Sequence, residues 1–109
     1  MRFFIIPLTV APGASDSKVI TGISGEVFKL GIYFPLNCGG ALFVSLKFGD
    51  LYFPAPVEGG MAELTADDIF VPLLEGMSYV IGAEQEIVLS GRNADPVYSH
   101  TAYLWVWVR

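Results

Sequence analysis

Glycine and proline occur so often along this chain that they leave little room for helices. The sequence contains 12 Gly and 7 Pro. An uninterrupted amphipathic run of about 12 residues, such as a surface helix would need, is hard to find between them. Short apolar runs separated by turn-forming residues are easy to find. This spacing predicts a chain built from β-strands, with few or no helices.

The clearest predicted strand covers residues 26–34. Successive side chains of a strand point to opposite faces, and one face of this segment is uniformly apolar. The core is expected to receive Phe28, Leu30, Ile32 and Phe34. The opposite face would carry Lys29, Gly31 and Tyr33. Pro35 then ends the strand, because proline is tolerated only at the ends or edges of a sheet.

A second strand, residues 41–48, is predicted to pair with residues 51–53 as a hairpin. Its inward side chains are expected to be Leu42, Val44, Leu46 and Phe48. Gly49-Asp50 separates the two runs, and a Gly-X pair is a preferred sequence for a tight type II′ turn. Because Pro54 and Pro56 follow, we expect this hairpin to reach the edge of its sheet.

Further strands are predicted along the rest of the chain, with the weakest signals at residues 61–64 and 69–73. They cover residues 3–6, 61–64, 69–73, a segment from about 78 or 84 to 90, and 99–108. Turns are predicted at Gly76 and over residues 91–96. Seven or eight short strands predict an all-β fold, a single antiparallel β-sandwich or jelly-roll-like domain over residues 1–109. Within it, residues 1–17 would form an N-terminal strand or an arm that orders against a neighbouring subunit.

The composition predicts a surface poor in charge, which we expect to be covered by Ser, Thr, Gly and Pro and in part hidden against another chain. Hydrophobic residues make up 53% of the sequence and charged residues only 16%, whereas an ordinary globular chain has about 25% charged residues. The formal net charge of −5 argues against nucleic acid and anionic membranes as partners, because binding to phosphates needs clustered Lys and Arg. No apolar run reaches the roughly 18 residues of a membrane helix.

The last predicted strand is apolar on both faces. One face carries His100, Ala102, Leu104, Val106 and Val108, and the other carries Thr101, Tyr103, Trp105 and Trp107. One face can line the core, but the other would be an unusually large exposed apolar patch unless something covers it. Since interfaces are enriched in Trp and Tyr, we predict an interface at Tyr103, Trp105, Trp107, Tyr33 and Phe43. In the alternative interpretation, a loop such as residues 54–68 covers this face within the monomer.

Side chains suited to catalysis are few. His100 is the single histidine and Cys38 the single cysteine, and no flanking motif supports a thiol-hydrolase pair between them. Carboxylates recur at Asp67-Asp68, at Glu84 with Glu86 and at Glu58 with Glu63. Solvated positions explain these carboxylates most simply, and neither Asp67-Asp68 nor Asn93 with Asp95 has the spacing of a calcium loop. We therefore expect a protein that is not an enzyme and has no catalytic, cofactor-binding or metal-binding residues.

A carbohydrate-binding or receptor-binding sandwich is the alternative function. Its sugar platform would need exposed aromatic rings in one plane, and Tyr103, Trp105 and Trp107 on one strand face could supply them. Against this alternative, both Trp residues lie in the most apolar segment of the sequence. That position is more typical of buried packing.

With its strands in place, the chain resembles the small β-sandwich proteins that tailed bacteriophages attach to their virions, including capsid decoration or cement proteins. The resemblance spans residues 24–108. It rests on Phe34-Pro35 and Phe53-Pro54, which close consecutive strands, and on residues 93–101, which lead into the apolar last strand. It implies a virion component that is made in the host cytoplasm and acts as a homo-oligomer, with a trimer favoured. Its partners would be the major capsid protein or other virion subunits.

Overall fold

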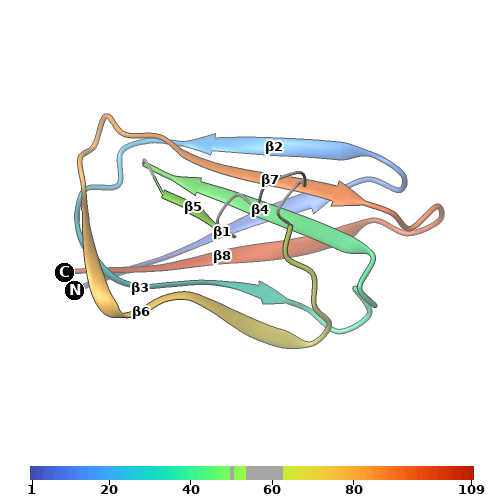
Figure 1. Ribbon diagram of the computed structural model, residues 1–109. Helices are drawn as coiled ribbons and strands as arrows, with labels where there is room; N and C mark the ends of the chain where they lie inside the picture. Colours follow the sequence, from blue (N-terminus) through green and yellow to red (C-terminus); the bar gives the residue numbers. More distant parts are fainter. Residues whose placement is uncertain (50, 54–62) are drawn as a thin grey trace.

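The protein consists of two β-sheets packed face to face (Figure 1). The computed structural model describes residues 1–49, 51–53 and 63–109, apart from the side chains of residues 75–77. Its strands are β1 (Arg2–Val10), β2 (Ser15–Ile20), β3 (Gly25–Phe34), β4 (Leu42–Phe48), β5 (Leu51–Phe53), β6 (Ile69–Ile81), β7 (Ile87–Asn93) and β8 (His100–Val108). Among the described residues there is no helix with the length and hydrophobicity needed to cross a membrane.

The strands are wound as a jelly roll. One sheet has the order β1-β8-β3-β6 and is called the β8 sheet below, and the other has the order β2-β7-β4-β5 and is called the β7 sheet. The antiparallel pairs β1–β8, β2–β7, β3–β6 and β4–β5 are nested within one another. Successive pairs fall in alternate sheets, as in a long hairpin wrapped around a core. The prediction of an all-β sandwich is therefore confirmed.

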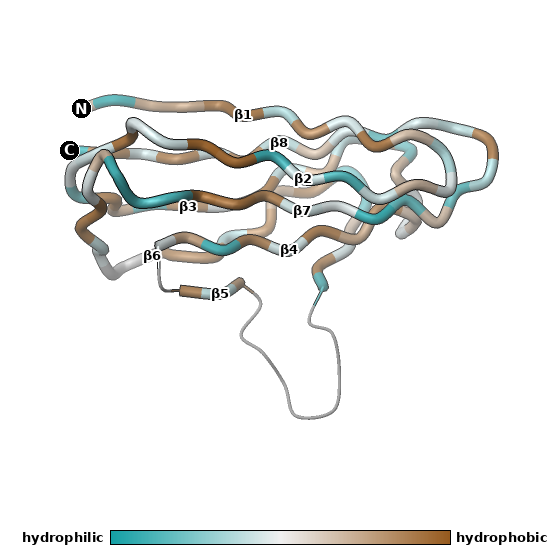
Figure 2. Tube along the Cα trace, turned by 90° about the horizontal axis from the view of Figure 1, so that it is seen from above, coloured by the Kyte–Doolittle hydropathy of each residue, from teal (hydrophilic) through white to brown (hydrophobic). Residues whose placement is uncertain are grey.

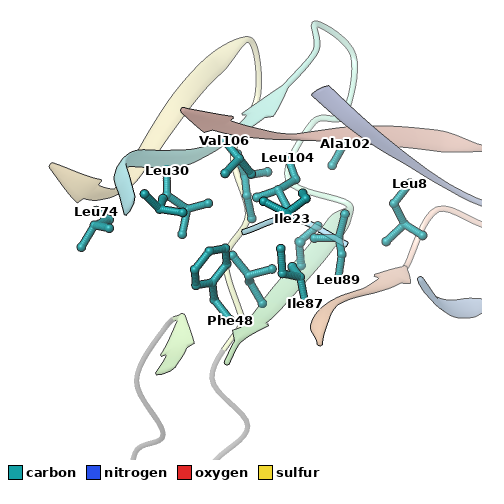
Figure 3. Packing of buried hydrophobic residues seen from close by; sticks show 14 of the residues in the cluster. Leu8, Ile23, Leu30, Phe48, Leu74, Ile87, Leu89, Ala102, Leu104 and Val106 are labelled. Atoms are coloured by element: carbon teal, nitrogen blue, oxygen red, sulfur yellow. The ribbon is translucent and has the colours of Figure 1, made fainter. Parts of the chain in front are cut away.

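Alternating side chains from both sheets fill the space between them. As predicted, the buried residues of β4 are Leu42, Val44, Leu46 and Phe48, and those of β8 include Ala102, Leu104, Val106 and Val108. Figure 3 shows Phe48, Leu89 and Leu104 meeting between the two layers. Burial of each such Val, Leu, Ile or Phe side chain stabilises the fold by about 1.5–3 kcal/mol. In Figure 2 the hydrophobic stretches run through the strands of both sheets.

The predicted hairpin is present in the β7 sheet. Phe48 pairs with Leu51, and Gly49 has a φ of 60°, a conformation that glycine adopts without steric cost. β5 is the last strand in the order of its sheet, so the predicted edge position is confirmed. Of the strand predicted over residues 61–64, the first two residues lie outside the described part, and Leu64 forms an isolated antiparallel bridge with Val44.

The expected burial of Phe28 is wrong. β3 buries Val27 and Leu30, and the pairing with β8 shifts register between Val27 and Lys29. A β-bulge of this kind inserts one extra residue and changes the face to which the preceding side chains point. Phe28 is that residue, and the Arg109 guanidinium lies 4.8 Å from the centroid of its ring.

The turn predicted at Gly76 is wrong, and the turn predicted over residues 91–96 was placed to begin too early, because in both places the strand continues through glycine. β6 runs through Gly76 to Ile81 and takes up extra residues where its register against β3 shifts. β7 runs through Gly91 to Asn93. A Cβ atom on Gly91 would lie 2.9 Å from a methyl carbon of Val10, so this glycine permits close packing between the sheets. The turn between β7 and β8 begins only after Asn93.

The N-terminal residues form part of the sandwich. β1 pairs with β8 along its whole length, which extends the strand predicted over residues 3–6. β2, which begins at Ser15 and pairs with β7, has no predicted counterpart beyond the strand or arm expected over residues 1–17. Its burial is low at most positions, so it lacks the apolar alternation by which strands are recognised.

Candidate functional site

The outer surface of the β8 sheet carries the largest group of aromatic side chains in the described structure. Strand register places Phe3 beside Trp107, Ile5 beside Trp105, and Tyr33 beside both Tyr103 and Phe70. The intervening residues of β1 and β8, such as Leu8 and Leu104, are buried in the core. We call this surface the aromatic face. Its members are Phe3, Ile5, Lys29, Tyr33, Phe70, Tyr103, Trp105 and Trp107.

The rings of the aromatic face pack against one another at angles that range from 26° to 88°. Phe3 stacks on Trp107 with centroids 4.6 Å apart and an interplanar angle of 26°. Trp105 and Trp107 meet at 62°, with centroids 5.9 Å apart, and Phe70 meets Trp107 at 88°. Edge-to-face and offset contacts between rings are favourable. The aromatic face is thus a packed layer of rings rather than a flat platform.

Gly31 allows this layer to form. A Cβ atom at Gly31 would lie 2.2 Å from the Phe70 ring and 2.8 Å from the carbonyl oxygen of Val71. Real Cβ atoms do not approach other atoms so closely, so the missing side chain lets Phe70 lie over the middle of the sheet. From there Phe70 also reaches Trp105, with ring centroids 5.4 Å apart.

Among the side chains described for the aromatic face, one is charged. The Nζ atom of Lys29 lies 4.8 Å from the centroid of Trp107 and 5.8 Å from that of Phe70. At these distances the ammonium interacts favourably with the ring electrons. Lys29 therefore forms part of the aromatic layer while remaining only half-buried.

Part of the aromatic face is open to solvent. Phe3 is 45% exposed and Ile5 is 52% exposed, while both Trp side chains are half-buried. A hollow of about 340 Å³ lies in this face and is lined by Ile5, Tyr33, Pro35, Tyr103 and Trp105. The indole N–H of Trp105 is buried without a hydrogen-bond partner among the described residues. A contiguous exposed apolar surface of this kind typically marks an interaction site.

The structure brings together four of the five residues predicted to form an interface. Tyr33, Tyr103, Trp105 and Trp107 share the aromatic face, but Phe43 lies in β4 and so belongs to the β7 sheet. Its ring is covered by Arg92, whose guanidinium carbon is 4.3 Å from the ring centroid. Alternation along a strand indicates which residues point outward, but it does not indicate the sheet to which a strand belongs.

Sequence reasoning missed four members of the aromatic face. They are Phe3, Ile5, Lys29 and Phe70. A signal for the first two was present, because Phe3 to Ile6 is apolar at every position and a strand can bury only one of its faces in a single core. Nothing in the local sequence pairs Phe70 with Tyr33, since that contact depends on the register between β6 and β3.

The described part of the loop once expected to cover the aromatic face lies elsewhere. Leu64 exchanges backbone hydrogen bonds of 2.7 and 2.8 Å with Val44 in β4. Glu63 forms an ion pair with Arg92 in β7. Residues 63 and 64 thus contact the β7 sheet. Residues 54–62, the first part of the proposed covering loop, lie outside the described residues.

Cys38 and His100 line one hollow of about 650 Å³, together with Tyr98 and Tyr103. Burial, and secondarily the charge of Asp67, raises the pKa of the Cys38 thiol, which disfavours the thiolate that a nucleophile needs. The Nε2 atom of His100 lies 2.9 Å from Oδ2 of Asp95. The imidazole is thereby engaged with a turn residue, and the Sγ atom of Cys38 lies 4.0 Å from the carbonyl oxygen of Thr101.

Asp95 organises the turn between β7 and β8. Its Oδ1 atom accepts hydrogen bonds from the backbone N–H groups of Val97 and Tyr98, at 2.9 and 3.2 Å. The hydrogen bond from Val97 and the one from His100, followed by that from Tyr98, lower the pKa of the Asp95 carboxyl. The neighbouring Asn93 is buried and donates to the carbonyl oxygens of Val10 and Tyr98. These hydrogen bonds fix the shape of the turn and connect it to Val10 in β1.

The remaining carboxylates have structural contacts or lie apart. Oδ1 of Asp67 accepts a hydrogen bond from the Gly39 N–H, and the Glu63 carboxylate pairs with Arg92. Glu84 and Glu86 are exposed, and Glu58 lies outside the described residues. Within the described ranges, no group of three or more His, Cys, Asp or Glu side chains is arranged to hold a metal ion.

Comparison with known proteins leaves this chain without a family. No family model, no curated protein and no solved structure matches it. The class that the fold and the site define is a jelly-roll β-sandwich with an aromatic outer face on one sheet. Because one fold supports many functions, a functional conclusion has to rest on the chemistry of that face.

Proposed function

We propose that this protein is a structural assembly protein that buries its aromatic face against a second copy of itself and against neighbouring subunits. The observation that carries the proposal is the exposure of Phe3 and Ile5 beside two half-buried Trp residues on one sheet. Removing apolar surface from water contributes about 25 cal/mol for each Å² buried. Interface cores are enriched in aromatic residues and poor in charge, and Lys29 is the one charged residue among the members of this face whose side chains are described.

The tilt of the rings favours a protein partner over a sugar. A sugar platform needs aromatic rings in one plane, whereas Trp105 and Trp107 meet at 62° and Tyr33 and Trp105 at 43°. The indole N–H of Trp105 is buried, so it is not presented to a ligand in solvent. An irregular apolar surface of this kind suits the side chains of another protein, which can interdigitate with it.

The edges of the β8 sheet favour association through its face. Both of its edge strands contain an exposed proline, Pro7 in β1 and Pro72 in β6. Proline has no backbone N–H, and the carbonyl oxygen of Pro7 already accepts a hydrogen bond from Nζ of Lys18. Such features oppose the pairing of an edge strand with another chain. Packing of face on face is therefore the favoured mode of assembly.

Within this proposal, the assembly is a virion and the protein is a capsid decoration or cement protein of a tailed bacteriophage. The resemblance noted from the sequence supports this role, and jelly rolls are common among viral capsid proteins. The protein would act as a homotrimer that contacts the major capsid protein or other virion subunits. It would need no cofactor or catalytic residue. Capsid and portal genes beside the gene that encodes this chain would support the virion role.

Two matched variants test the assembly itself. Ile5→Asp places a charge on the aromatic face, and Val19→Asp places the same charge on β2 of the other sheet, where Val19 is 56% exposed against 52% for Ile5. Size-exclusion chromatography with light scattering should give a multiple of the monomer mass for the wild type and for Val19→Asp. Ile5→Asp should run as a monomer. A monomeric wild type, or equal behaviour of the two variants, would contradict the proposal.

A further inference from the structure

The outer surface of the β7 sheet contains a polar groove. Its volume is about 440 Å³, and its lining includes Asp16, Ser17, Ser45, Glu63, Ser90 and Arg92. Small-molecule sites in proteins typically measure about 300–1,000 Å³. The groove therefore has the size of a ligand site, and it lies on the opposite side of the sandwich from the aromatic face.

Three serines form the floor of this groove. Strand register aligns Ser17 of β2 with Ser90 of β7, and Ser90 with Ser45 of β4. Neighbouring strands lie about 4.8 Å apart, so three hydroxyl-bearing residues stand side by side across the sheet. In the next row along the strands, Arg92 pairs with Phe43. These side chains are longer than those of the serines, so the surface is lower over the serine row.

Beside the serine row, the guanidinium of Arg92 and the carboxylate of Glu63 hold each other in place. Nη2 of Arg92 donates to Oε1 of Glu63 at 3.0 Å, and Nε donates to Oε2 at 3.3 Å. The guanidinium also stacks over Phe43, and its hydrogen bond to Glu63 raises the pKa of Arg92. A two-point contact of this kind orients both groups. The groove thus offers donors and acceptors that are positioned before any ligand arrives.

These groups select a class of ligand. An anion would meet two carboxylates, Asp16 and Glu63, against a single guanidinium that is already paired. An apolar ligand would remove the serine hydroxyls from water without giving them hydrogen-bond partners, which is costly. A sugar hydroxyl both donates and accepts, as a serine hydroxyl does, and can satisfy carboxylates and guanidinium alike. We propose that the groove binds a neutral carbohydrate.

This inference is independent of the proposed assembly function. A protein that buries the aromatic face in an assembly would keep the groove of the β7 sheet exposed, because the two surfaces lie on opposite sheets. It also places the sugar on different residues from the Trp platform considered from the sequence. Loss of assembly in Ile5→Asp would leave sugar binding intact, so the two proposals fail separately.

The test is an NMR titration of the ¹⁵N-labelled protein with neutral trisaccharides, namely maltotriose, cellotriose, mannotriose and chitotriose. At least one of them should shift the amide resonances of Ser90, Gly91 and Arg92 in a saturable manner. The absence of any shift across this panel at millimolar concentrations would overturn the proposal. Saturable shifts of the Trp105 and Trp107 indole resonances instead would move the sugar site to the aromatic face and also overturn it.

Variants then assign the binding to the groove. Ser90→Val replaces a floor hydroxyl with a methyl group and adds a second methyl group beside it, and it should weaken the affinity about fivefold or more, as loss of a hydrogen bond to a ligand does. Thr9→Val makes the same kind of change on the β8 sheet and should leave the affinity unchanged. Glu63→Gln keeps the shape of the side chain and should also weaken binding. It provides a second test should Ser90→Val fail to fold. Equal affinities for wild type, Ser90→Val and Glu63→Gln, or tighter binding of inorganic phosphate than of any sugar, would contradict the assignment.

Discussion

The two outer faces of the sandwich follow the same alternation but carry opposite chemistry. A row across three strands of the β8 sheet contains Phe3, Trp107 and Lys29. A row across three strands of the β7 sheet contains Ser17, Ser90 and Ser45. The inward residues of both sheets are apolar and join one core. Inward positions are constrained by burial in the core, whereas outward positions are not, so the two outer faces can differ in chemistry while the two inner faces cannot.

The largest effects are expected in the core that both faces share. Leu104→Ala in β8 and Leu89→Ala in β7 each truncate a fully buried side chain. Each should lower the free energy of unfolding by about 2–5 kcal/mol, and the two losses should be similar because the cavities open into one core. Chemical denaturation measures both values. A negligible loss in either variant would show that one sheet does not depend on the shared core.

A smaller loss of stability is expected from a substitution at Gly31, where the aromatic rings pack directly on the backbone of β3. Gly31→Ala places a Cβ atom against the Phe70 ring and the Val71 carbonyl, and should lower the free energy of unfolding by about 1–3 kcal/mol. Near-ultraviolet circular dichroism should change as well, because Phe70 packs on both Trp rings. Gly82→Ala is the control, since its Cβ atom would come no closer than 3.8 Å to another group, and it should change stability by less than about 0.5 kcal/mol.

The turn that joins β7 to β8 should respond to pH. The pKa of Asp95 is lowered by hydrogen bonds from Val97, His100 and Tyr98. A carboxylate with a depressed folded-state pKa stabilises the fold above its unfolded pKa of about 3.9, and this contribution is lost as the pH falls through the folded-state pKa. Asp95→Asn should therefore melt below the wild type at about pH 7 and approach it at about pH 2. A melting difference that stays constant across this range would contradict the assignment.

The smallest changes in stability are expected from removing the cation on each outer face, Lys29 on the β8 sheet and Arg92 on the β7 sheet. Lys29→Met removes the ammonium over Trp107 and should lower the free energy of unfolding by about 0.5–1 kcal/mol. Arg92→Met removes the guanidinium over Phe43 together with the ion pair to Glu63. Its effect should shrink in high salt, because exposed ion pairs are screened. Denaturation at low and high salt measures both, and a stronger salt dependence for Lys29→Met would reverse the expected contrast.

The alternation of side chains along a strand predicted burial correctly where the strands are regular. The inward residues of β4 and the outward positions of Tyr103, Trp105 and Trp107 follow directly from a period of two. The prediction failed at Phe28, because the bulge in β3 breaks that period. It also failed at Gly76 and Gly91, because a glycine that serves close packing or a bulge is indistinguishable in sequence from one that makes a turn.

The candidate sites were predictable only in part, for a related reason. Four of the five expected interface residues share the aromatic face, while Phe43 does not. The groove on the β7 sheet was not predicted at all, because Ser17, Ser45 and Ser90 are far apart in the sequence and individually unremarkable. Residues so distant become neighbours only through the nested pairing of β2, β7 and β4.

Local sequence patterns were enough to predict that this chain forms strands, which side of most strands is buried, and that chemically reactive side chains are scarce. These properties depend on local composition and on the period of two, which act within a few residues. The pairing of strands in the folded protein sets which strands share a sheet, and so which outward residues share a face. That pairing depends on burying all the inward residues in one core, and no local pattern encodes it.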